Sequence, residues 1–154
     1  MTTDYIVASL PTLVFGQPPA LTREAFLNLV GHDPLSGSYL KRWREHETVL
    51  RNALAEARGG ETFRRDSSIC SLFWQNRVQS CFQEKDIARR EELLDRVWWD
   101  AAGELTPLSN PLSEGALATY AVRLDIALRR AAISTAAGNA AFDRLTSETR
   151  TFSL

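Results

Sequence analysis

Hydrophobic residues recur every three or four positions in two long segments, the spacing of a helix with one buried face. In residues 38–57 the opposite face is charged, and Gly59 and Gly60 follow as terminators. In residues 113–131 the apolar seam follows Ser113, a favoured helix N-cap. The two predicted apolar faces consist of Tyr39, Leu40, Trp43, Val49, Leu50, Ala53, Leu54 and Ala57, and of Leu117, Tyr120, Leu124, Leu128 and Ala131.

Two shorter segments have clear helix boundaries. One begins at the N-cap Thr22 and ends at Gly31. The other begins at the N-cap Asp86 and reaches about residue 104, because Pro107 closes it. Its expected buried stripe consists of Ile87, Leu94, Val97, Trp98 and Ala101.

Two further helices are expected from weaker patterns. Residues 69–82 place Ile69, Phe73, Val78 and Phe82 on apolar positions. Residues 134–149 are rich in alanine, and Gly138 interrupts them, so we expect a separate final helix there.

Apolar residues crowd the N-terminal segment 5–10, and periodicity alone does not separate a buried strand from a buried helical turn there. Thr2, Thr3 and Asp4 can cap a helix, which favours the helical interpretation. Residues 1–4 carry no Lys or Arg, so we do not expect a secretory signal peptide.

These elements predict an all-α protein. Beyond residue 30 no alternation of apolar and polar residues indicates a strand. We expect a compact bundle of about five to seven helices, forming one domain over residues 1–154 with a flexible loop at 59–68.

Composition narrows the range of partners. Of the 154 residues, 44% are hydrophobic, and 18 basic side chains balance 19 acidic ones, so no overall field attracts nucleic acid. No apolar stretch reaches the roughly 20 residues of a membrane span, so we expect no direct membrane insertion. Cys70 and Cys81 lie too far apart on a continuous helix for a disulfide, which favours reduced thiols and a cytosolic location.

Catalytic and metal-binding motifs are not found. His46-Glu47 starts like a zinc-protease helix, but Leu50 stands where the second histidine is required. The other histidine is His32, and no glycine-rich phosphate loop occurs. We therefore predict a non-enzyme without metal or cofactor, although a deepest pocket in which His32 or His46 converges with carboxylates would favour a small enzyme instead.

The adjacent tryptophans suggest an interaction surface. They lie about 100° apart on a helix, so if Trp98 is on the buried stripe, Trp99 is at its edge. Packing of Trp99 within the chain is the alternative, and Trp43 is expected in the core. The candidate protein interface is Trp99, Arg96, Arg89 and Arg51.

Four stretches together resemble a known family. They are "YIVASLPTLVFG" with "PPALTREAFL", "RWREHETVLRNALAEAR", "REELLDRVWWDAAGEL", and "LATYAVRLDIALRR" with "AAGNAAFDRL". In this order they resemble small bacterial proteins whose genes lie within V-type (V/A-type) ATPase operons. Those proteins are similar to the central-stalk C subunit of the ATPase, called d in eukaryotic complexes.

The resemblance implies a helical adaptor without catalytic residues, similar to part of the C/d subunit. The expected partners are V-type ATPase subunits, either the rotor ring or the central shaft. The expected location is cytoplasmic, peripheral at the inner membrane through those subunits. The chain is short for the full stalk subunit, which favours an accessory or assembly role. The alternative is a helical protein-interaction or ligand-binding module unrelated to ATPases.

Overall fold

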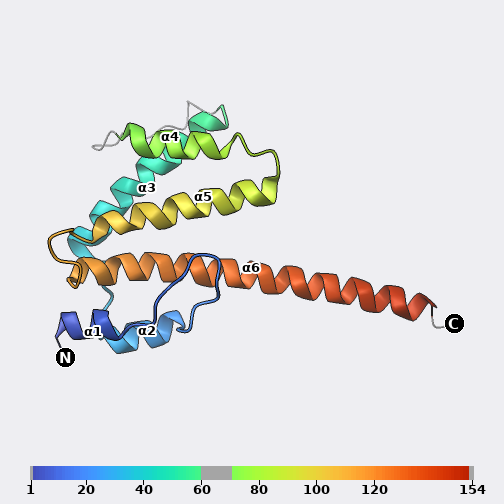
Figure 1. The fold of residues 1–154 in the computed structure, drawn as a ribbon, viewed down its shortest axis with the longest axis horizontal. Coiled ribbons are helices and arrows are strands. Elements are labelled where there is room, and N and C mark those ends of the chain that lie inside the picture. Colours follow the sequence, from blue (N-terminus) through green and yellow to red (C-terminus); the bar gives the residue numbers. More distant parts are fainter. Residues whose placement is uncertain (1, 60–70, 153–154) are drawn as a thin grey trace.

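A computed structural model describes residues 2–59 and 71–152, and in them every regular element is helical (Figure 1). The α-helices are α1 (Thr3–Ser9), α2 (Arg23–Val30), α3 (Gly37–Ala57), α4 (Leu72–Cys81), α5 (Ile87–Ala102) and α6 (Glu114–Phe152), and the 3-10 turn η2 (Gly103–Leu105) follows α5. The all-α prediction is confirmed, and so is the helical interpretation of residues 5–10. The expected loop at 60–68 lies outside the described residues.

The first half of α6 is the centre of the fold, with α1 and α2 on one side and α3, α4 and α5 on the other (Figure 1). On the α1–α2 side, Ile6, Phe26 and Val30 pack against Leu117 and Leu124. On the other side a larger core includes Trp43, Val78, Val97, Ala118 and Val122. α6 is therefore buried on two faces over this half.

Local signals explain how α2 is positioned. The Thr22 side chain accepts a hydrogen bond from the Ala25 N–H, and Gly31 ends the helix with φ of 87°, a left-handed conformation that favours glycine. Phe26 stacks on Tyr120 of α6 with ring centroids 5.1 Å apart. The Tyr120 hydroxyl donates to the Pro11 carbonyl at 2.7 Å, which ties the preceding loop to α6.

The second half of α6 corrects two expectations. Residues 134–149 are part of one 39-residue helix that continues through Gly138, and this half projects away from the other helices (Figure 1). The bundle is thus less compact than expected. A glycine inside a helix costs only about 1 kcal/mol relative to alanine, which is too little to end a helix begun on a packed half.

Two apolar positions were assigned wrongly. Phe73 is 61% exposed, and Trp74 next to it is buried instead. Ile87 is exposed at the start of α5, whereas Trp98 is partly buried and packs against the core on its expected stripe. Short helices leave few turns from which to determine the buried face, so adjacent aromatic residues are easily exchanged in such an assignment.

Candidate functional site

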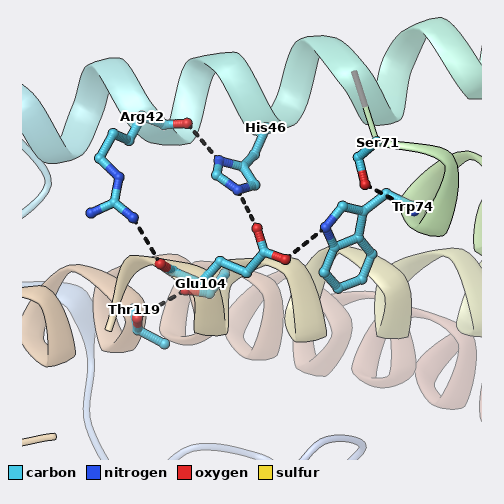
Figure 2. A network of polar contacts seen from close by, with 7 residues as sticks. Arg42, His46, Ser71, Trp74, Glu104 and Thr119 are labelled. Atoms are coloured by element: carbon cyan, nitrogen blue, oxygen red, sulfur yellow. Dashed lines mark hydrogen bonds and ion pairs between the residues drawn. The ribbon is translucent and has the colours of Figure 1, made fainter. Parts of the chain in front are cut away.

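A polar network joins α3, α4 and η2 around Glu104 (Figure 2). Glu104 Oε2 lies 2.5 Å from Nε2 of His46 on α3. Its other oxygen, Oε1, accepts from the indole Nε1 of Trp74 on α4 at 2.9 Å. Glu104 occupies the 3-10 turn directly after α5, and this turn directs the carboxylate between the two other helices.

The hydrogen bonds of His46 indicate how protons are arranged in this network. Its Nδ1 lies 2.8 Å from the Arg42 carbonyl, which can only accept, so Nδ1 carries a hydrogen. Nε2 is then the ring nitrogen that faces the Glu104 carboxylate. Arg42 also donates to the Glu104 carbonyl at 3.0 Å, which fixes the turn to α3 at a second point (Figure 2).

The other contacts of this network are structural. The Ser71 hydroxyl accepts from the Trp74 N–H as the N-cap of α4. The His46 side chain is 10% exposed, whereas that of Glu104 is 47% exposed. Within residues 2–59 and 71–152, no three metal-ligating side chains gather into a group. The network is a clamp between helices, with one carboxylate face open to solvent.

The second histidine also meets a glutamate. His32 Nε2 lies 3.2 Å from Glu114 Oε2, and the Thr3 hydroxyl donates to the other Glu114 oxygen at 3.4 Å. Both side chains of the histidine pair are largely exposed. This contact joins α1 and the loop after α2 to the start of α6.

The structure does not place Trp99 at an exposed edge. Trp99 is 5% exposed, and its ring meets the edge of Phe15 at 5.5 Å between centroids. Arg123 lies over the indole and donates to the Trp99 carbonyl at 3.0 Å. Burial lowers the pKa of the Arg123 guanidinium, and nearby Asp100 opposes this shift. The expectation that Trp99 is exposed for a partner is wrong, because packing within the chain already uses its faces.

The three predicted interface arginines do not form one cluster. Arg51 pairs with Glu47 at 2.9 Å, and Arg89 with Glu92 at 2.9 Å, each within its own helix. Such exposed pairs contribute only about 0.3–0.5 kcal/mol. Of the three arginines, Arg96 is the one that shares a contact with Trp99. Its guanidinium lies 5.2 Å from the centre of the Phe15 ring, which also packs against Trp99.

Arg96 borders an open groove between α4 and α5. The cavity measures about 450 Å³. It is lined by Phe73, Asn76, Arg77, Ser80, Cys81, Leu93, Arg96 and Val97. Next to it Leu72 is also exposed. The groove therefore presents apolar surface beside two guanidinium groups.

The Asp100 carboxylate forms ion pairs with both arginines of the groove. Asp100 lies 2.8 Å from Arg77 and 3.2 Å from Arg96, so the three side chains together carry one positive charge. Cys81 has a free thiol that donates to the Arg77 carbonyl at 3.2 Å, and burial raises the pKa of this thiol. Cys70 lies outside the described residues.

Sequence reasoning missed Glu104, Trp74 and Arg77. Glu104 was visible only as the end of a helix before a proline, and Trp74 only as one of two adjacent aromatic residues. No family model, curated protein or solved structure matches this chain. Of the helices described, none is long and apolar enough to cross a membrane.

Proposed function

We propose that this protein is a non-catalytic accessory, assembly or stalk-type subunit associated with a bacterial V-type ion-translocating ATPase. The four stretches that resemble proteins of V-type ATPase operons support the choice of partner. On this proposal the protein is cytoplasmic and peripheral at the inner membrane, where it contacts the rotor ring or the central shaft.

The observation that carries the interaction role is the groove between α4 and α5. Its lining includes the apolar side chains of Leu93, buried Val97 and exposed Phe73. Large exposed apolar side chains near guanidinium groups are typical of protein interfaces. With two arginines sharing Asp100, the groove suits a partner helix that carries a carboxylate beside apolar side chains. Phe73, Arg77 and Arg96 thus replace Trp99 as the proposed contacts.

Affinity purification of the tagged chain from the native bacterium tests this proposal. We expect V-type ATPase subunits to co-purify with the wild-type chain, and the double variant Phe73→Asp, Arg96→Glu to lose them. Ile87→Asp is the matched control. Ile87 is 71% exposed on α5, the helix that carries Arg96, but it does not line the groove. Wild-type purification without any ATPase subunit would contradict the ATPase association.

The second candidate is a helical interaction module unrelated to ATPases, which the same groove supports. The same purification distinguishes the two candidates. Proteins that are not ATPase subunits, that co-purify with the wild-type chain and that are lost from the Phe73→Asp, Arg96→Glu variant would favour the unrelated module. Retention of every partner by the groove variant would contradict the groove under both candidates.

A further inference from the structure

One apolar seam runs along α6 from its packed half onto its projecting half. Leu117, Ala121, Leu124 and Leu128 follow one another at intervals of four and three residues, and all four belong to the core on the α1–α2 side. Ala131, Thr135, Gly138, Phe142 and Leu145 continue the same spacing of four and three, with Thr135 as the one polar residue among these five positions. This is the heptad spacing of a coiled-coil seam.

The seam is covered at one end and uncovered at the other. Leu117 and Leu124 are at most 1% exposed, whereas Phe142 is 68% and Leu145 is 63% exposed. Around Gly138 nothing lies within 4 Å of where a Cβ would stand. The covering helices α1 and α2 lie only along the first half of α6 (Figure 1).

A hollow lies where the seam leaves the packed half. It measures about 290 Å³ and is lined on α6 by Ala127, Arg130, Ala131 and Ser134, and elsewhere by Phe15, Gly16, Gln17, Pro18 and Trp99. An apolar cavity of about 150 Å³ accommodates benzene, so this hollow has room for a large apolar side chain. The hollow therefore borders the seam at Ala131, before Gly138, and large exposed residues follow on the seam after Gly138.

We propose that the projecting halves of α6 from two copies of this chain pair antiparallel, with a two-fold axis near Gly138. That axis sets Leu145 of one copy opposite Ala131 of the other, because each lies seven residues from Gly138. It likewise sets Phe142 opposite Ser134, each four residues from Gly138. Large side chains then meet small ones and enter the hollow, and the two contacts are equivalent by symmetry.

The order of large and small residues along the seam favours an antiparallel second copy over a parallel one. In a parallel pair Phe142 would meet Phe142, and Gly138 would meet Gly138, which leaves the hollow empty. A glycine at the crossing lets two helices approach closely, toward the short end of the usual interaxial distance of about 8–10 Å. The seam positions from Leu117 to Leu145 carry no Asp, Glu, Lys or Arg, so pairing does not bury a charge there.

Sedimentation of the full chain over a range of concentrations tests the pairing. We expect a dimer, and we expect Phe142→Asp to raise its dissociation constant at least about thirtyfold, as for a hot-spot residue. The control is Ile133→Asp, since Ile133 is 61% exposed on the opposite face of α6 and should leave the dimer unchanged. A wild-type monomer at all concentrations, or equal effects of the two variants, would overturn the proposal.

Cysteine cross-linking tests the antiparallel register. In a Cys70→Ser background, Gly138→Cys should form disulfide-linked dimers, and Ala140→Cys on the opposite face should not. Ala131→Cys and Leu145→Cys should cross-link when the two variants are mixed. Cross-linking of Leu145→Cys with itself would show a parallel pair and overturn the proposal. The groove variant Phe73→Asp, Arg96→Glu should remain a dimer, so this proposal and the proposed function fail independently.

Discussion

The two halves of α6 carry the same apolar seam in different surroundings. In the first half, two layers of helices cover α6, and polar side chains tie it to neighbouring elements, as when Thr119 donates to the Ala102 carbonyl at the end of α5 at 2.8 Å. The second half extends beyond those layers as a single helix (Figure 1). Nucleation is the costly step of helix formation, so the packed first half supplies the nucleus from which the second half extends. An apolar stripe thus predicts a covered surface without saying which element covers it.

Two leucines at equivalent seam positions test the contrast most strongly. Leu117 is fully buried and Leu145, 28 residues later, is 63% exposed. We expect Leu117→Ala to lower the free energy of unfolding by about 2–5 kcal/mol, because it leaves a cavity in a packed core. We expect Leu145→Ala to change it by no more than about 0.5 kcal/mol.

Denaturant unfolding followed by circular dichroism measures both leucine variants. The Phe142→Asp background keeps self-association from contributing to the comparison. Equal losses at the two positions would show that the second half of α6 is packed as tightly as the first, and would remove the contrast.

Substituting alanine for two glycines of α6 should change the stability of the helix in opposite directions. A Cβ on Gly115 would stand 2.3 Å from the Leu105 carbonyl oxygen and 2.9 Å from Pro107 Cδ, so we expect Gly115→Ala to cost about 3 kcal/mol. Gly138 has open space around it, and we expect Gly138→Ala to stabilise its helical turn by about 0.5–1 kcal/mol.

Hydrogen exchange in the Phe142→Asp background separates the two glycine effects. Gly115→Ala should speed amide exchange across η2 and the first half of α6. Gly138→Ala should slow exchange only in the turns around it. A neutral Gly115→Ala would indicate that α6 and η2 are not in close contact.

Sequence patterns predicted the helices where the buried face and the caps agreed. Thr22, Asp86 and Gly31 marked helix ends correctly, because capping is a local property. Trp98 packs against the core as expected, but Trp99 is buried as well and not at an exposed edge, because it packs on Phe15, a loop residue 84 positions earlier. Local periodicity carries no information about such a partner.

The candidate site was less predictable than the fold. Arg96 lines the groove as a predicted interface residue, but the groove itself depends on how α4 packs on α5. The Glu104 network joins residues 30 and 58 positions apart, and a lone glutamate before a proline gives no sign of either contact. Contacts between distant segments require the tertiary arrangement.

The clamp at Glu104 gives the smallest expected effect and shows how η2 supports the first half of α6. Glu104→Gln replaces the carboxylate with a neutral amide, so the hydrogen bond that the Trp74 indole donates to residue 104 loses its charge assistance. Because the Glu104 side chain is 47% exposed, water can partly replace it, and we expect a loss of about 1 kcal/mol in the free energy of unfolding. Glu91→Gln is the matched control, because Glu91 is 57% exposed and its ion pair with Arg58 is long at 3.9 Å. The free energy of unfolding of this variant should stay within about 0.5 kcal/mol of the wild-type value. Denaturant unfolding and indole fluorescence measure both variants, and a Glu104→Gln variant as stable as its control would show that the network does not hold η2 in place.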